Sequence, residues 1–209
     1  LSINAKTANV IHLRESFKLS SNIPIKKIED SLISIRDIDS ISVAFATSLN
    51  DNLDEIDIKF EVSPSDNYRI FILPNAIRDI KGVTNDTLQF NLVSQALEDY
   101  GNIYLDVIRN SQSKFILHLL NSNGEIIREY NNVNQNSTFN FDYIRPGKYT
   151  FRLIEDLNNN NLWDTGNYLK RVKPEPVYYF PSELEVRPNW DLNETFDLNI
   201  KESINDSIK

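Results

Sequence analysis

Short segments in which apolar and polar residues alternate run through most of the chain, and this pattern constrains the fold more than any other feature. A period of two places successive side chains on opposite faces of a strand. Clear examples are residues 41–46, 56–62 and 138–141. Turn signals such as Asn123-Gly124 and Pro146-Gly147 separate the segments. Many short strands at a spacing of roughly ten residues predict an all-β fold built from antiparallel β-sandwiches.

The chain of 209 residues has room for two such domains. Residues 94–100 are polar and acidic, and we predict the domain boundary there. Residues 1–14 are predicted to be the end of a preceding module, because the strand-like segment 10–13 has no obvious local partner. Residues 201–209 are predicted to be a polar tail. Methionine is absent even at position 1, so we expect a processed or excised piece of a longer protein.

Composition excludes several classes of function. The formal net charge of -8 disfavours binding to nucleic acid or to an anionic membrane surface. The absence of cysteine excludes disulfides, thiolate metal sites and cysteine nucleophiles. Histidine occurs only at positions 12 and 118, and His118 is predicted to be a half-exposed strand residue rather than a ligand. No nucleophile, P-loop, zinc-protease or dinucleotide-binding motif is present. We therefore predict a protein that is not an enzyme, without a cluster of titratable groups in a deep pocket. A pair of glycosidase carboxylates is the enzymatic alternative that sequence leaves open.

One loop has the ligand order of a calcium site. Oxygen-bearing side chains stand at its positions 1, 3, 5 and 9, and the carbonyl of position 7 is available, as in an EF-hand loop without flanking helices. The predicted ligands are Asp156, Asn158, Asn160, the Leu162 carbonyl and Asp164, completed by water or Asn167. Asn161 replaces the glycine of position 6 and would need left-handed φ, which asparagine tolerates. The alternative is an asparagine-rich solvated turn.

Aromatic residues form a second candidate site. Trp163, Tyr178, Tyr179 and Trp190 could make a docking face, since aromatic residues dominate binding hot spots. The alternative is that they fill a sandwich core. Tyr178 and Tyr179 are adjacent in a strand, so they must point to opposite faces and one of them should be exposed.

Two stretches resemble a known family. The first is 68–82, where a strand runs into Pro74-Asn75-Ala76, Asp79 and Gly82. The second combines Arg145-Pro146-Gly147, the loop 156–168 and the segments 173–179 and 187–191. Both resemble envelope lipoproteins of Bacteroidota that contain bacterial Ig-like domains, and the resemblance covers about residues 16–198.

The resemblance implies an Ig-like sandwich at 15–98 and a transthyretin- or Cna-B-like sandwich at 99–200. It also implies a lipid-anchored outer-membrane protein, whose only membrane contact is an anchor outside this chain. The predicted function is a non-catalytic structural or docking portion of a cell-envelope complex, with other envelope proteins as partners. The alternative is a carbohydrate- or substrate-binding module. Exposed aromatics beside Asn or Asp would favour sugar, and a large apolar patch would favour a protein partner.

Overall fold

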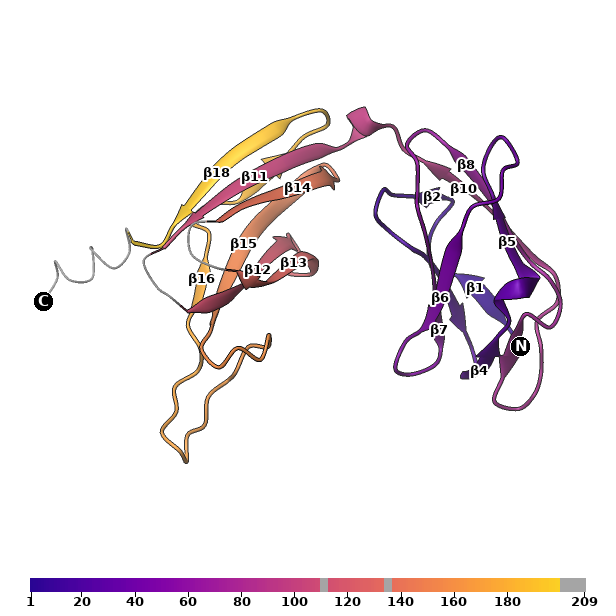
Figure 1. Ribbon diagram of the computed structural model, residues 1–209, viewed down its shortest axis with the longest axis horizontal. Helices are drawn as coiled ribbons and strands as arrows, with labels where there is room; N and C mark the ends of the chain where they lie inside the picture. The colour runs from indigo at the N-terminus through magenta and orange to yellow at the C-terminus, as the bar shows by residue number, and fades with distance from the viewer. Residues whose placement is uncertain (110–112, 134–136, 200–209) are drawn as a thin grey trace, which may run out of the picture. The chain divides into compact units, whose positions relative to one another are not determined.

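The computed structural model of the protein describes residues 1–109, 113–133 and 137–199 (Figure 1). The chain divides into two compact units, Leu1–Leu97 and Glu98–Lys209. The division falls inside the segment 94–100, at the short 3₁₀ helix η2 (Leu97–Asp99). Both units are built from strands, and the predicted all-β fold of two consecutive sandwiches is confirmed. The predicted polar tail 201–209 lies outside the described residues.

The first unit packs two four-stranded sheets face to face, with strand orders β1-β3-β7-β6 and β2-β10-β8-β5. A two-stranded pair, β4-β9, and the 3₁₀ helix η1 (Asp30–Leu32) complete it. Its strands are β1 (Ile3–Ala5), β2 (Val10–Ile11), β3 (Phe17–Ser21), β4 (Ile25–Ile28), β5 (Ile33–Arg36), β6 (Phe45–Leu49), β7 (Glu55–Phe60), β8 (Asn67–Ile72), β9 (Ile77–Asp79) and β10 (Leu88–Ser94). Alternation decides which face is buried: β7 buries Ile56, Ile58 and Phe60 and leaves Lys59 exposed.

Residues 1–14 belong to this first sandwich, so the prediction that they end a preceding module is wrong. β1 pairs with β3, and β2 pairs in parallel with the end of β10. Val10 lies opposite Val93 and Ile11 opposite Ser94, and Ile11 is part of the buried core. The partner of β2 lies at the far end of the same unit, which is why the local sequence did not reveal it.

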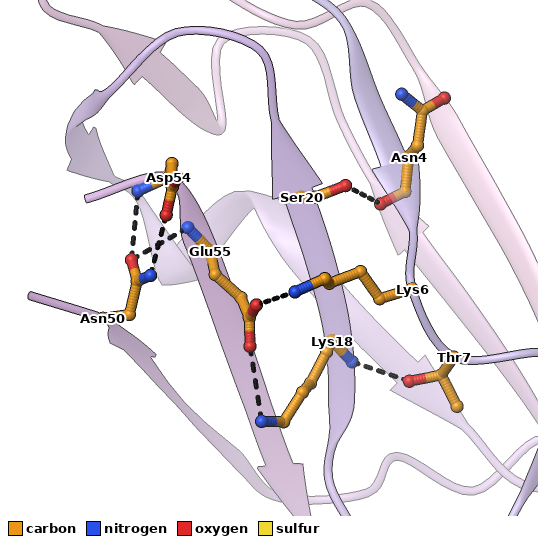
Figure 2. A network of polar contacts seen from close by, with 8 residues as sticks. All are labelled: Asn4, Lys6, Thr7, Lys18, Ser20, Asn50, Asp54 and Glu55. Atoms are coloured by element: carbon orange, nitrogen blue, oxygen red, sulfur yellow. Dashed lines mark hydrogen bonds and ion pairs between the residues drawn. The ribbon is translucent and has the colours of Figure 1, made fainter. Parts of the chain in front are cut away.

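Polar contacts hold the same N-terminal segment to the sheet (Figure 2). The Glu55 carboxylate lies between the ammonium groups of Lys6 and Lys18, at 3.3 Å from the latter. The hydrogen bond from Lys6 is the main cause that lowers the pKa of Glu55. The backbone N–H of Lys18 donates to the hydroxyl of Thr7 at 3.0 Å. These contacts join the segment that follows β1 to β3 and β7.

The second unit packs a sheet of order β14-β11-β18 against one of order β13-β12-β15-β16, with β17 also paired to β15. Its strands are β11 (Gly101–Ile108), β12 (Lys114–Asn121), β13 (Ile126–Val133), β14 (Ser137–Ile144), β15 (Gly147–Asp156), β16 (Val177–Tyr179), β17 (Leu184–Val186) and β18 (Asp191–Asp197). β11 and β18 pair in parallel. Phenylalanines from both sheets meet in the core, among them Phe141, Phe151 and Phe196.

The outer face of the β13-β12-β15-β16 sheet is partly buried, whereas the inner face forms the core. β12 is buried at the six consecutive positions 115–120 instead of at alternate positions. Phe115, Leu117 and Leu119 face the core, so Ile116 and His118 lie on the other face. The long connection from β15 to β16 extends beyond the sheet (Figure 1). Its residues 161–163 line a pocket together with Ile116 and His118 of this outer face. Within the described ranges, no helix is long and apolar enough to cross a membrane.

Candidate functional site

Four side chains from four neighbouring strands form a row across this outer face. His118 of β12 lies opposite Glu129 of β13 on one side and opposite Arg152 of β15 on the other. Arg152 in turn lies opposite Tyr179 of β16. Strand register therefore brings together residues that lie up to 61 positions apart in the chain (from 118 to 179). We call Glu129, His118, Arg152 and Tyr179 the polar row.

The hydrogen bonds of the polar row fix the state of His118. The Arg152 guanidinium approaches His118 Nδ1 from Nη2 at 2.8 Å and from Nε at 3.2 Å. A guanidinium can only donate, so Nδ1 must be an unprotonated acceptor. The proton of the neutral ring then lies on Nε2, which donates to Glu129 Oε2 at 2.9 Å. The arrangement selects neutral histidine, held between a cation and an anion.

His118 is 5% exposed, so the prediction of a half-exposed residue is wrong. Burial is the main cause that lowers the pKa of His118, and the positive charge of Arg152 lowers it further. Glu129 acts in the opposite direction with a smaller effect. Glu129, His118 and Arg152 line one pocket together. The expectation that no titratable groups converge in a deep pocket stays a prediction.

The state of His118 makes the stability of the second unit depend on pH. Its folded pKa lies below the unfolded value of about 6.5, so the unfolded chain binds more protons as pH falls through this range. The free energy of unfolding should therefore decrease from pH 7.5 to pH 5. In His118→Gln, whose amide can accept from Arg152 and donate to Glu129, this contribution should be absent. Urea unfolding followed by tryptophan fluorescence measures the free energy of unfolding of the second unit at each pH, since Trp163 and Trp190 are both in that unit. The same pH dependence in the native protein and in His118→Gln would refute a contribution from His118.

The predicted calcium loop begins where β15 ends. The buried Asp156 accepts the backbone N–H of Asn160 on Oδ1 at 3.1 Å and that of Asn161 on Oδ2 at 2.9 Å. Asn158 and Asn160 both place Nδ2 on Asp164 Oδ2, at 2.5 and 2.9 Å. Asn161 has the left-handed φ of 61° that the loop pattern requires at position 6. The side chains of positions 1, 3, 5 and 9 thus turn toward the inside of one tight loop.

The remaining predicted ligands are the Leu162 carbonyl and Asn167. Leu162 is exposed, and its N–H donates to Asn160 Oδ1 at 2.8 Å. Asn167 belongs to a separate turn, in which its Oδ1 accepts the N–H of Lys170 at 3.0 Å. Among the two candidates for the last position of a calcium shell, water is therefore favoured over Asn167.

Glu175 supports both ends of the loop, and the sequence did not reveal it. Its carboxylate accepts the N–H of Leu157 on Oε1 at 2.8 Å and that of Asp164 on Oε2 at 3.0 Å. Its carbonyl accepts the indole N–H of Trp163 at 3.2 Å. Glu175 is buried, so these contacts are shielded from water. The segment that returns to β16 thereby holds the loop against the end of the sandwich.

The loop chemistry suits a weakly bound oxygen-seeking cation. Calcium takes carboxylate, amide and carbonyl oxygens. An asparagine amide presents either nitrogen or oxygen to the same point after a half-turn. Asn158 and Asn160 would offer oxygen beside Asp164 by giving up the hydrogen bonds that their Oδ1 atoms accept from the N–H groups of Asn160 and Leu162. Within the described ranges, no three acidic or histidine side chains are close enough to hold a metal by themselves. Amide and carbonyl oxygens would therefore have to supply most of the shell.

A pocket of about 420 Å³ lies between the loop and the polar row. Ile116, Ile154 and Val177 form an apolar row on its floor, in register across β12, β15 and β16. Trp163 and Leu162 of the loop form a wall.

The four predicted docking residues are divided among different surroundings. Tyr178 packs against the core, with the Arg109 guanidinium 5.5 Å from its ring centroid. Tyr179 points to the opposite face and is exposed, which confirms that the pair is split. Trp163 and Tyr179 line the same pocket. Trp190 lies apart from them beside β18, under the guanidinium of Arg187 at 5.1 Å from its ring centroid.

Comparisons with known proteins give distant likenesses. No protein-family model and no curated protein sequence matches the chain. Among solved structures, native alpha-2-macroglobulin from Escherichia coli (domains MG0-NIE-MG1) is similar at 10% identity and a TM-score of 0.38, over 85% of this chain and 69% of that one. The pilin variant BcpA* (D312A) of Bacillus cereus has 13% identity and a TM-score of 0.33, over 94% and 69%. The N-terminal part of the bacterial S-layer protein SbsC has 10% identity and a TM-score of 0.41, over 76% of this chain and 42% of that one.

Proposed function

We propose that the chain is a non-catalytic structural and docking portion of an exported cell-envelope protein. The observation that supports this most directly is the series of two sandwiches, each with a hydrophobic core of its own. Such units can space binding surfaces along a chain. The resemblance of 68–82 and 145–191 to Bacteroidota envelope lipoproteins supports an outer-membrane location. The anchor would lie outside the 209 residues, and the partners would be other envelope proteins.

The surface around Trp190 is the best candidate for docking to a protein. Trp190 is about half exposed, and Arg187 covers part of its ring. Tryptophan and arginine are the side chains most enriched at the centres of interfaces. A photo-crosslinking amino acid at position 190, in cells that make the full-length protein, should give a discrete cross-linked envelope protein. Position 168, where the native Tyr168 is 96% exposed, is the control. Equal labelling from both positions would contradict docking at Trp190.

We also propose that calcium stabilises the second unit through the loop 156–164. The support is the inward-turned set Asp156, Asn158, Asn160 and Asp164, together with the left-handed Asn161. The Leu162 carbonyl and water would complete the shell. With two formal charges in the shell, the affinity should be weak, on the order of 10⁻⁴–10⁻³ M, as in extracellular modules.

Calcium at about 10 mM should therefore raise the free energy of unfolding of the second unit by about 1–3 kcal/mol relative to chelator. Asp156→Ala should abolish this increment, because it removes the first ligand and one of the two charges. Asp106→Ala, an exposed acid on β11 outside the loop, should retain it. Urea unfolding followed by tryptophan fluorescence gives the increment for each protein. Identical unfolding of the native protein with calcium and with chelator would leave only the asparagine-rich turn.

A further inference from the structure

The outer face of the second unit carries an extended groove. The pocket beside the loop adjoins a second one of about 490 Å³, and Arg152 and Tyr179 line both. Each volume is typical of a small-molecule site. The second pocket reaches the turns at 121–124 and 181–183. The two together follow β12 from Ile116 to Asn121, which is about 16 Å at 3.3 Å per residue. We call this surface the outer groove.

Each charged group of the outer groove contacts another polar group of the groove. Glu129 and Arg152 hold the neutral His118 between them. In the second pocket, Lys148 pairs with Glu183 at 2.6 Å. The formal charges of the lining therefore cancel, with Glu129 and Glu183 against Arg152 and Lys148. A charged ligand would have to break one of these pairs, whereas a neutral one would not, so the lining favours a neutral ligand.

Two half-exposed aromatic rings stand along the outer groove. Trp163 is 49% exposed at the loop end, and Tyr179 is 51% exposed where the two pockets meet. Beside them lie polar groups suited to hydroxyls, namely Asn161, Arg152 and Thr150. Apolar ring faces next to fixed hydrogen-bonding groups suit a ligand with C–H faces and many hydroxyls.

An extended peptide fits this face less well. Peptides that bind sheets gain affinity from main-chain hydrogen bonds at an exposed edge. The backbones of β12 and β15 are paired on both sides, and the outer groove lies on their face. Polar contacts to a ligand must therefore come from side chains. From the neutral lining, the aromatic rings and the length of the groove, we infer that the outer groove binds a neutral oligosaccharide.

The test is titration of the full chain with neutral hexasaccharides of glucose, N-acetylglucosamine and mannose, followed by calorimetry. Saturable binding of at least one of them is expected. Trp163→Ala and Tyr179→Ala should each weaken it about tenfold, since each removes one stacking ring. The matched control is Tyr168→Ala, an exposed aromatic of the same connection that does not line the groove, and it should bind as the native protein does. Near-ultraviolet circular dichroism checks that each variant is folded.

Three results would overturn the inference. The first is that no neutral hexasaccharide binds saturably. The second is that Trp163→Ala and Tyr179→Ala bind as tightly as the native protein. The third is that an anionic hexasaccharide such as oligogalacturonate binds more tightly than the neutral ones. Each titration is run both with calcium and with chelator. Loss of the calcium effect on stability while binding persists would refute the calcium proposal alone. Cross-linking at position 190 reports on docking separately.

Discussion

Replacing Arg109 by alanine is expected to lower the free energy of unfolding of the second unit by about 3–5 kcal/mol. Arg109 and Glu155 form an ion pair in which both side chains are almost completely buried. The Arg109 guanidinium also lies 5.5 Å from the ring centroid of Tyr178 and 6.0 Å from that of Phe115. Removal of the cation leaves the Glu155 carboxylate buried beside the apolar core without this ion-pair partner. Urea unfolding followed by tryptophan fluorescence measures the loss in the second unit alone.

Two further variants separate this explanation from a general loss of packing. The double variant Arg109→Met/Glu155→Leu should recover most of the lost stability, because it removes both charges and keeps apolar volume. Arg187→Ala breaks a pair with Glu185 in which both partners are about half exposed, and it should cost far less stability than Arg109→Ala. A loss in Arg109→Ala as small as that in Arg187→Ala would show that the buried pair does not stabilise the fold.

The sequence predicted strands well because the period of two is a local property. It predicted the polar row poorly because the row depends on register. His118 alternates with core residues, but the whole run 115–120 is apolar apart from His118, and such a run is typical of a strand buried on both faces. That signal could have placed His118 inside. Nothing local indicates that Glu129 and Arg152 flank it, because only the pairing of β12 with β13 and β15 brings them there.

The loop shows the same division between local and distant information. The left-handed Asn161 and the inward Asp156, Asn158, Asn160 and Asp164 follow from spacing within nine residues, so the sequence could predict their geometry. Glu175 comes from the segment that returns from the loop to β16. Its role depends on how that segment closes onto the loop, which no spacing rule gives. Buried carboxylates that accept distant backbone N–H groups are therefore the features that sequence analysis misses most readily here.

The position of residues 1–14 in the first unit leads to the second large expected effect. Ile11 is 0% exposed and packs in the core of the first unit. Ile11→Ala should lower the free energy of unfolding of that unit by about 2–5 kcal/mol, since it removes apolar contacts and leaves a cavity. Differential scanning calorimetry of the full chain should show a lower melting temperature for the first unit. Tryptophan fluorescence should show the second unit unchanged, because the first unit contains no tryptophan.

The neighbouring residue supplies the control. Val10 lies on the same two-residue strand but is 40% exposed, so Val10→Ala should change stability by only about 0.5 kcal/mol. If residues 1–14 were instead the end of a preceding module, alanine would have a small effect at both positions. A large difference between Ile11→Ala and Val10→Ala therefore requires that β2 is seated in the core beside β10. Equal small effects would place the segment outside the sandwich, and the first unit would then begin only at β3.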